Sequence, residues 1–265
     1  INSLMKLPGD KFIEKEISKL AEHGALEDQI LKLCVDPNRI RIKDKEDRAT
    51  REKVLNNFVM RILRKMINSG LLVSFNGCFS TGKEANVYYA ILRENQEAAI
   101  KIYKVDILDY KNRSRYMEGE FRLRRWNYSK NPRKMIKKWS EKEFRNLSRL
   151  HTCGIPCPAP LYLTENVLVM GFLGIDGVPF PKLKDAQMLT DHLEYLFQSC
   201  VNLMRRMYHE AKLVHADLSE YNLLYEPSET EPKIYIIDVS QSVEHDSPRA
   251  LDFLRHDISN IAYFF

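Results

Sequence analysis

HADLSEYN, residues 215–222, is the stretch of this 265-residue sequence that carries most of its chemistry. It places a carboxylate at Asp217 and an amide at Asn222, and further along the chain Asp238 ends the apolar run KIYIID. Phosphoryl transfer needs a carboxylate that positions the acceptor and oxygen ligands that hold Mg²⁺ against the phosphates. The residue types and their order therefore predict that Asp217 positions an acceptor, while Asn222 and Asp238 ligate Mg²⁺.

A glycine-rich stretch, GCFSTGKEANVYYA at residues 77–90, contains G-x-x-x-x-G-K, which is most of the phosphate-binding P-loop signature. However, Glu84 follows Lys83 at the position where a P-loop has Ser or Thr. The flanking runs LLVSF and NVYYAIL are rich in β-branched, aromatic and aliphatic residues, which predicts a strand, a glycine turn and a second strand. Two interpretations fit this layout: a flap that covers nucleotide phosphates, or a hairpin turn that binds no ligand.

Two further charged residues complete the set. Lys101 lies in the predicted strand AAIKIY, and Glu143 lies in a predicted helix over residues 139–150. Each residue also has an explanation without a catalytic role. Lys101 could be a charged residue of an edge strand, Glu143 could be a solvated charge on a helix, and Asp238 could be a turn residue. Protein kinases, however, have a glycine-rich flap, a strand lysine, a helix glutamate, a catalytic loop and a metal-binding aspartate in this same order. The shared order favours the flap interpretation of the glycine-rich stretch.

Three long motifs make the sequence resemble one family. STGKEANVY, VHADLSEYNLL and IIDVSQSVEHDSPRALDFLRHD resemble the RIO family of atypical serine/threonine protein kinases, specifically its first subfamily. The resemblance covers roughly residues 44–265 and implies an α+β fold, a trimmed form of the two-lobed protein-kinase-like fold. It implies a helical extension over residues 1–70, a small β-rich lobe over 71–173 with a basic insertion at 108–138, and a helical lobe over 174–265.

The resemblance also assigns an ATP and Mg²⁺ site residue by residue. It makes Asp217, Asp238, Lys101 and Glu143 catalytic. The other nucleotide-binding positions are Ser80, Thr81, Gly82 and Lys83 over the phosphates, and Val87, Ala99, Met170, Gly171, Leu173, Leu224 and Ile237 around the base. Two departures from ordinary protein kinases are present: Ala216 replaces the arginine before the catalytic aspartate, and Val239 and Ser240 replace Phe-Gly. Without that arginine, the loop has no cation that reads an activation-loop phosphate.

Helical periodicity outlines much of the remaining chain. An amphipathic helix that ends at Gly70 is predicted by Leu55, Phe58, Val59, Ile62, Leu63 and Met66. A long helix over residues 190–211 is expected to bury Leu193, Leu196, Phe197, Cys200, Val201, Met204 and Met207. Ser247 and Pro248 predict the start of a last helix that runs through Leu254.

The net charge of +5 is unevenly distributed along the chain. Residues 111–138 hold eleven Lys or Arg against Glu118 and Glu120, a local charge of +9. Trp126 and Tyr128 lie among these cations, so the segment predicts contact with RNA phosphates and unpaired bases, with a solvated basic loop as the alternative. The cysteines are scattered, which fits a reducing compartment, and no apolar run is long enough to predict a membrane helix.

These features predict an ATP- and Mg²⁺-dependent serine/threonine kinase or ATPase, and the resemblance implies a role in maturation of the small ribosomal subunit. The expected partners are protein and rRNA of the pre-ribosomal small subunit, without membrane or DNA, in the cytoplasm with the nucleus as a second location. The alternative is a pseudokinase that acts as a nucleotide-gated assembly factor without turnover. Residues 239–265 are too few for a peptide-binding platform, so we expect ATP hydrolysis, through a transient aspartyl-phosphate at Asp238, to dominate over protein phosphorylation.

Overall fold

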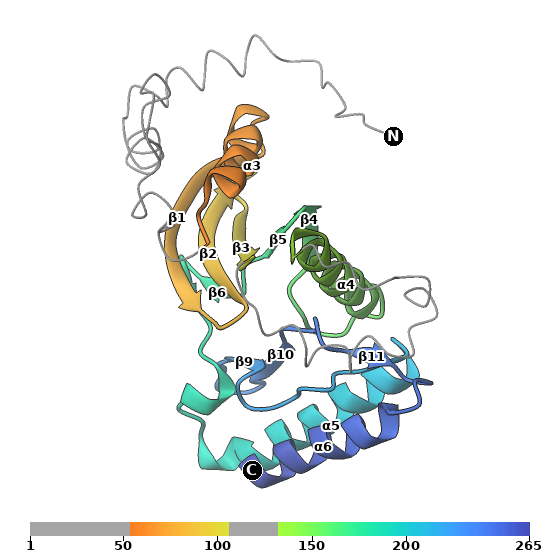
Figure 1. Ribbon diagram of the computed structural model, residues 1–265. Helices are drawn as coiled ribbons and strands as arrows, with labels where there is room; N and C mark the ends of the chain where they lie inside the picture. The colour runs from red at the N-terminus through yellow and green to blue at the C-terminus, as the bar shows by residue number, and fades with distance from the viewer. Residues whose placement is uncertain (1–53, 106–131) are drawn as a thin grey trace, which may run out of the picture. The chain divides into compact units, whose positions relative to one another are not determined.

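The computed structural model describes residues 54–105 and 132–265, and the chain forms two compact units. One unit comprises residues 1–76 and 90–96, and the other comprises residues 77–89 and 97–265. Figure 1 shows their helices and strands, with labels where there is room. All the predicted site residues belong to the second unit. The predicted division into a helical extension and two lobes stays a prediction.

In the first unit, helix α3 (Asn57–Asn68) is capped at both ends by local hydrogen bonds. The Asn56 side chain accepts hydrogen bonds from the backbone N–H groups of Phe58 and Val59, both at 3.0 Å. At the other end Gly70 adopts a φ of 68°, in the left-handed region, and donates to a carbonyl of the last turn. The helix buries Val59, Met60, Ile62, Leu63 and Met66. The predicted amphipathic helix is therefore confirmed, although Leu55 lies before its start.

The strands form a five-stranded sheet in the order β1-β2-β3-β5-β4. Their bounds are β1 Leu72–Thr81, β2 Ala85–Leu92, β3 Glu97–Tyr103, β4 Pro160–Thr164 and β5 Val167–Gly171. A tight turn joins β1 to β2, so the glycine-rich stretch has the predicted strand, turn and strand layout and lacks the helix that follows a P-loop. Strand β3 is central, pairs antiparallel with β5 and is buried from Ala98 to Tyr103. Lys101 is thereby carried into the interior.

Helix α4 (Pro132–Thr152) contacts β4 and β5 and buries Ile136, Trp139, Leu147 and Leu150. It begins well before Trp139, the predicted start, because proline is well tolerated in the first turn of a helix. The last four cations of the basic segment, from Arg133 to Lys138, therefore lie on this helix. The part of the predicted insertion up to residue 131 lies outside the described residues.

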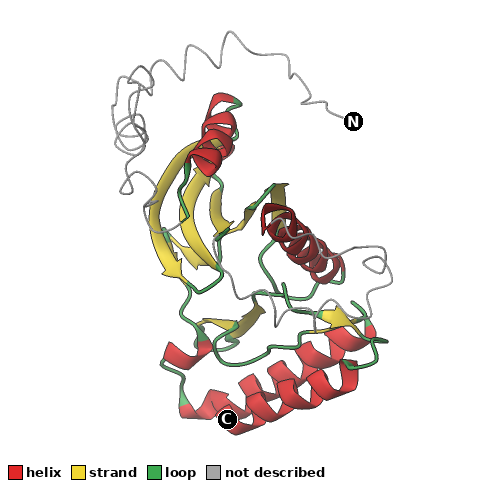
Figure 2. Cartoon of the chain, viewed as in Figure 1, coloured by secondary structure: helices red, strands yellow, loops and turns green. Residues whose placement is uncertain are grey.

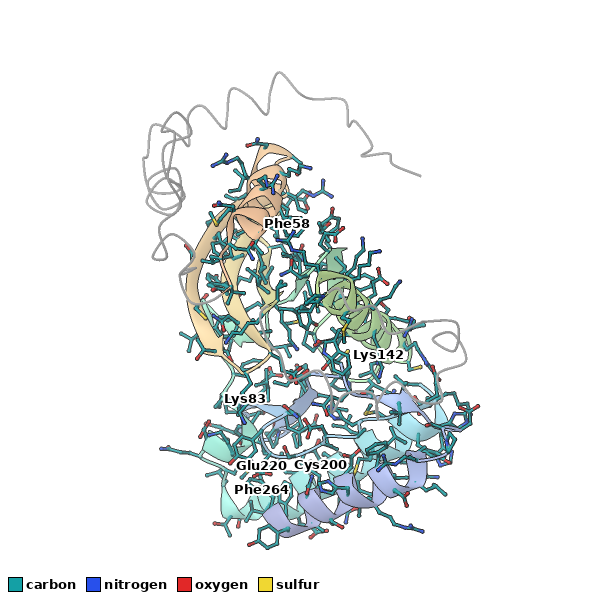
Figure 3. All side chains as sticks on the ribbon, in the orientation of Figure 1. Phe58, Lys83, Lys142, Cys200, Glu220 and Phe264 are labelled. Carbon is teal, nitrogen blue, oxygen red and sulfur yellow. The ribbon has the colours of Figure 1, made fainter. Side chains whose placement is uncertain are left out.

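The chain after β5 is built from short strand pairs and two long helices. The hairpin β6 (Gly174–Ile175) and β7 (Val178–Pro179) comes first, then the one-turn helices η5 (Leu183–Asp185) and η6 (Thr190–His192), α5 (Leu193–His209), β8 (Leu213–Val214), β9 (Leu223–Glu226), β10 (Lys233–Ile236), β11 (Val243–Glu244) and α6 (Ala250–Phe264). Strand β9 pairs with β10, and β8 pairs with β11. Helices α5 and α6 run side by side (Figure 1 and Figure 2), and Cys200 of one and Phe264 of the other join one apolar core (Figure 3).

The last two helices differ from their predicted form in two respects. Helix α6 begins at Ala250, because the N–H of that residue closes a turn onto the carbonyl of Ser247, and it continues to Phe264 rather than stopping at Leu254. On α5 most of the predicted face is buried or half-buried, but Val201 is 39% exposed and Leu203 is buried instead. Within residues 54–105 and 132–265, none of the helices has the length and apolar character that a membrane span requires.

Candidate active site

The centre of the site is a buried ammonium group. Lys101 Nζ on β3 contacts both carboxylate oxygens of Glu143 on α4, at 2.8 and 2.9 Å, and Oδ1 of Asp238 at 3.1 Å. Only 9% of the Lys101 side chain and 2% of the Glu143 side chain are exposed, whereas 40% of the Asp238 side chain is exposed. Burying a charge without a partner lowers the stability of the fold by several kcal/mol, which is a large part of the total stability of a domain. The structure thus brings three of the predicted catalytic residues into one ionic cluster.

The pKa values in this cluster follow from burial opposed by charge. Burial acts to lower the pKa of Lys101, but the carboxylates of Asp238 and Glu143 outweigh it and raise that pKa above its usual value. Burial acts to raise the pKa of Asp238, yet the charge and hydrogen bond of Lys101 bring it below its usual value. At Glu143 burial dominates, and the pKa is raised despite Lys101. The exposed member of the cluster, Asp238, therefore stays ionised at neutral pH.

Helix α4 holds Glu143 in place through contacts on the same face. One turn beyond Glu143, Asn146 Nδ2 donates to the carbonyl of Val239 at 2.9 Å. A further turn on, Arg149 forms an ion pair of 2.7 Å with Glu244 on β11. The spacing of three residues places these side chains on one side of the helix. The face that presents Glu143 to the lysine is therefore fastened to the segment that follows Asp238.

The predicted catalytic loop, residues 215–222, has hydrogen bonds within itself and to Ile237, the residue before Asp238. Asn222 Nδ2 donates to the backbone oxygen of Asp217 at 2.8 Å and approaches its carboxylate at 3.4 Å. The N–H of Ile237 donates to Asn222 O at 3.0 Å, and Nε2 of His215 lies 3.1 Å from Ile237 O. Burial raises the pKa of Asp217, and the charge of His215 partly offsets it. The loop is thus connected to the residue before Asp238 by one backbone hydrogen bond and by the His215 side chain.

Asp257 on α6 holds the loop by hydrogen bonds to its backbone, a role that the sequence analysis did not predict. Its carboxylate is buried and accepts hydrogen bonds from the N–H groups of Ala216 at 2.9 Å and Leu218 at 2.8 Å. Ala216 has a φ of 68°, a left-handed conformation that needs support from its surroundings in a residue other than glycine. The predicted last helix stopped at Leu254, so Asp257 fell outside it, although it is the last residue of the motif IIDVSQSVEHDSPRALDFLRHD that carries the family resemblance.

Tyr103 is a second residue that the sequence analysis missed. Its hydroxyl donates to Glu143 Oε2, and its ring centroid lies 5.4 Å from Lys101 Nζ. Residues two apart in a strand share one face, so the position of Tyr103 relative to Lys101 was a usable signal. The tyrosine completes the shell of polar contacts around the buried glutamate.

The predicted phosphate-binding residues lie on the flap. Ser80 and Thr81 end β1, and Gly82 and Lys83 form the turn, where Lys83 is labelled in Figure 3. The turn is closed by a 2.9 Å hydrogen bond from Gly82 N to Ala85 O. Within residues 54–105 and 132–265, no side-chain hydrogen bond joins Ser80, Thr81 or Lys83 to the Lys101 cluster. These four positions are therefore placed by the turn alone, and their role stays a prediction.

The predicted base-binding residues come from several strands, and two of them, Met170 and Gly171, end β5. The N–H of Gly171 donates to Ala159 O at 2.8 Å, and the carbonyl of Leu173 accepts from Phe180 N at 3.0 Å. Among the bonds of the described residues, the carbonyl of Gly171 and the N–H of Leu173 are then the backbone groups left to meet a base. Ala99 is buried, while the other apolar positions are half-buried: Val87, Met170, Leu224 and Ile237.

Oxygen atoms suited to Mg²⁺ are available on Asp238 and on Asn222. Asn222 uses its Nδ2 on Asp217, and Asp238 uses Oδ1 on Lys101 and Ser240, so the bonds among the described residues leave Asn222 Oδ1 and Asp238 Oδ2. Such oxygens are the ligands that Mg²⁺ prefers, with waters and phosphate oxygens as the rest. In the described part of the chain, no group of three or more His, Cys, Asp or Glu could hold a metal by itself. The donor set fits Mg²⁺ bound together with a nucleotide.

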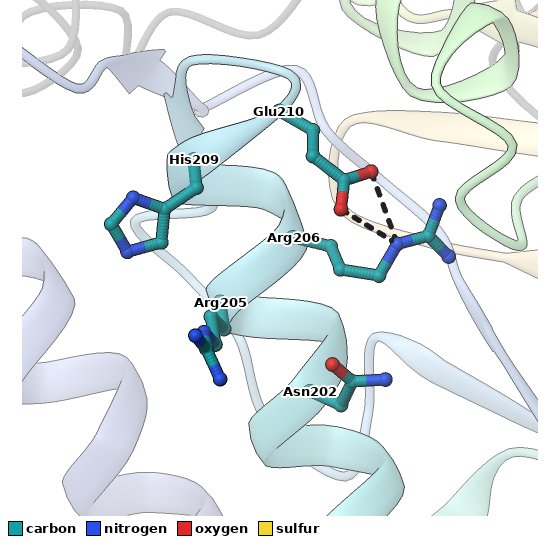
Figure 4. Close-up of a pocket in the computed structure, with 5 residues that line it drawn as sticks. All are labelled: Asn202, Arg205, Arg206, His209 and Glu210. Carbon is teal, nitrogen blue, oxygen red and sulfur yellow. Dashed lines mark hydrogen bonds and ion pairs between the residues drawn. The ribbon is translucent and has the colours of Figure 1, made fainter.

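A pocket on α5 contains none of the predicted site residues. Its lining residues, labelled in Figure 4, are Asn202, Arg205, Arg206, His209 and Glu210. Arg206 pairs with Glu210 at 3.1 Å and donates to Cys153 O at 2.6 Å. The bond to Cys153 fastens the turn after α4 to α5, and the pair with Glu210 holds the Arg206 side chain in place. These contacts give Arg206 a structural role.

The fold and the ionic cluster define a protein-kinase-like molecule. The Rio2 kinase–ADP/Mg²⁺–phosphoaspartate complex from Chaetomium thermophilum matches it with a TM-score of 0.63 and 19% identity, over 95% of this chain and 68% of that chain, which shows the fold. The RIO domain family matches residues 86–265, and the chain belongs to the RIO family of atypical serine/threonine protein kinases, in its RIO1 subfamily.

Two curated relatives illustrate the similarity. The serine/threonine-protein kinase rio1 of Dictyostelium discoideum is 49% identical over 100% of this chain and 46% of its own length. The serine/threonine-protein kinase RIO1 of Homo sapiens is 48% identical over 98% of this chain and 46% of its own length. The chain therefore spans about half the length of the curated relatives it matches.

The support from Asp257 predicts a measurable loss of stability. The Asp257→Asn variant keeps the side-chain shape but replaces one acceptor oxygen by a donor that faces a backbone N–H. We expect the free energy of unfolding to fall by about 1–3 kcal/mol in urea denaturation, because a buried donor is left unsatisfied. The control is Asp252→Asn on the same helix, where the ion pair with Arg255 is exposed and a change below about 0.5 kcal/mol is expected. Equal stability of the two variants would contradict the supporting role.

Proposed function

We propose that this chain is an ATP- and Mg²⁺-dependent phosphoryl-transfer enzyme that acts in maturation of the small ribosomal subunit. The observation that carries the proposal is the contact of Lys101 Nζ with both Glu143 and Asp238. Two comparisons support ATP and Mg²⁺ as the ligands here: the relatives are named serine/threonine-protein kinase RIO1, and the related Rio2 complex contains ADP and Mg²⁺. We also propose the trimmed two-lobed arrangement, with a helical extension over residues 1–70 and lobes over 71–173 and 174–265.

Each residue of the ionic cluster and of the loop 215–222 beside it has a distinct role in this proposal. Lys101 holds a nucleotide phosphate, and Glu143 keeps the ammonium group in position. Asn222 and Asp238 hold Mg²⁺, which neutralises charge on the phosphates. Asp217 orients the acceptor and takes its proton, and its raised pKa makes it a stronger base than an aspartate of ordinary pKa.

The segment after Asp238 favours hydrolysis over phosphorylation of a peptide. Val239, Ser240 and Val243 are 0%, 1% and 2% exposed, and β11 in this segment pairs with β8. A segment buried in this way offers little surface on which a peptide could be laid out, and positioning is most of what a kinase contributes. We propose that the Asp238 carboxylate bonds to the γ-phosphorus as the bond to ADP breaks. Water then attacks the phosphorus, inorganic phosphate leaves and the carboxylate is restored.

Labelling with γ-labelled ATP tests this proposal. The wild type is expected to acquire protein-bound label that hydroxylamine removes, because hydroxylamine cleaves acyl phosphates and spares phosphoserine. Asp238→Ala should lose both label and magnesium-dependent turnover. Asp217→Asn should keep ATP affinity within about twofold, yet lose turnover by roughly 10²–10⁴-fold, the usual contribution of a general base.

The outcomes separate the competing functions. Hydroxylamine-resistant label with rapid phosphorylation of an added protein would make the chain an ordinary protein kinase. Nucleotide binding with no turnover in the wild type would favour the pseudokinase alternative. Equal loss of ATP affinity in Asp238→Ala and Asp217→Asn would contradict the separate roles assigned to these two residues.

We further propose that the basic segment 111–138 contacts rRNA of a pre-ribosomal small subunit, in the cytoplasm and secondarily the nucleus, without membrane or DNA. Most of the segment lies outside the described residues. In its described part, Arg133 and Lys134 are exposed in the first turn of α4, which contains no acidic residue. The support for an anionic partner is the charge of +9 that the whole segment carries.

The RNA contact predicts a change in salt dependence. Replacing Arg122, Arg124 and Arg125 with Gln should weaken binding to rRNA fragments and reduce the slope of log affinity against log salt by about 0.7–0.9 per lost phosphate contact. The control is Arg255→Gln, which removes one exposed cation from α6. An unchanged slope in the triple variant would mean that the basic segment is only a solvated loop.

A further inference from the structure

Ser240 occupies the position at which ordinary protein kinases have the glycine of Asp-Phe-Gly. The residue is 1% exposed, and its hydroxyl donates to Oδ1 of Asp238 at 2.9 Å. Lys101 Nζ contacts the same oxygen at 3.1 Å. Oδ1 therefore has two donors, while Oδ2 has none among the hydrogen bonds of the described residues.

We propose that Ser240 is a positioning residue that fixes the orientation of the Asp238 carboxylate. Its hydroxyl acts with Lys101 on Oδ1, so that Oδ2 is the oxygen presented to the metal and to the phosphoryl group. A glycine at this position has no side chain that could do so. The inference rests on the proposed function and adds a residue that sets the plane of the Asp238 carboxylate, and so the direction in which its free oxygen points.

A second donor is needed because Lys101 has several tasks. Rotation about the last side-chain bond of an aspartate is broad, so the plane of the carboxylate turns easily unless one oxygen is held. Lys101 already shares its ammonium group with Glu143, and in the proposed function it also meets a phosphate. The serine hydroxyl has no competing partner in the described structure. It can therefore keep Oδ1 in place when the lysine turns toward the nucleotide.

The backbone that carries Ser240 is itself held. The preceding residue, Val239, is 0% exposed, and its carbonyl accepts a 2.9 Å hydrogen bond from Asn146 Nδ2 on α4. The backbone next to Ser240 is therefore fixed, and a residue that positions another side chain needs such a rigid support.

Ser242 shows that burial alone does not explain the contact. It lies two residues further on and is 0% exposed, yet its hydroxyl has no hydrogen-bond partner in the described part of the chain. The segment thus tolerates a buried hydroxyl without a partner. Ser242→Ala is consequently a matched control, because it removes an equally buried hydroxyl that does not touch Asp238.

The test compares ATP affinity with and without Mg²⁺ by isothermal titration for the wild type, Ser240→Ala, Ser240→Thr and Ser242→Ala. In Ser240→Ala the gain in affinity on adding Mg²⁺ should fall about three- to tenfold, the scale of one lost ordinary hydrogen bond, with magnesium-free affinity within about twofold. Ser240→Thr keeps the hydroxyl and should restore most of the gain. Ser242→Ala should match the wild type.

A crystal structure of Ser240→Ala with ADP and without Mg²⁺ gives an independent readout, because the bound phosphates can draw Lys101 away from Asp238 Oδ1. We expect the Asp238 carboxylate to occupy a second orientation, whereas a single unchanged orientation would overturn the positioning role. An unchanged magnesium gain in Ser240→Ala, or an equal loss with and without Mg²⁺, would overturn it as well. If the wild type itself shows no magnesium gain, the proposed function fails, and the crystal structure still decides the role of Ser240.

Discussion

A lysine ammonium group enclosed by the fold must be matched by negative charge, and in this chain the match comes from two distant segments. Lys101 lies on the central strand β3, Glu143 on α4 and Asp238 just after β10. Removing one partner of a buried ion pair typically costs about 3–5 kcal/mol, because an uncompensated charge remains. The three segments are therefore held to one another by the charge that the site needs for chemistry.

The contacts around this cluster limit how far its parts can move separately. Asn146 and Arg149 fasten α4 to the segment after Asp238, and Asp257 fastens α6 to the catalytic loop. In ordinary protein kinases, displacement of the glutamate-bearing helix controls activity. Here that displacement would break hydrogen bonds with buried partners, so the arrangement favours a site that is assembled before the nucleotide arrives.

The sequence predicted those features whose signal is local. The catalytic loop, Lys101, Glu143 and the strand–turn–strand layout follow from motif spacing, and α3 follows from apolar periodicity. The early start of α4 and the continuation of α6 past Leu254 were missed. The start of α6 was placed too early, since Ser247 and Pro248 imitate a helix start while closing a turn. Asp257 and Asn146 were missed because their value depends on partners far along the chain. Tertiary hydrogen bonds to backbone groups leave no trace in composition or spacing.

A double-variant cycle on magnesium-dependent ATP hydrolysis tests most directly whether Lys101 and Glu143 act as one unit. The cycle compares Lys101→Met, Glu143→Gln and the double variant with the wild type. If Glu143 acts only by holding the lysine, the double variant loses no more activity than Lys101→Met alone, and the coupling energy lies in the range of about 0.5–3 kcal/mol seen for residues in contact. Fully additive losses would contradict the account, because they would mean that the two residues act independently.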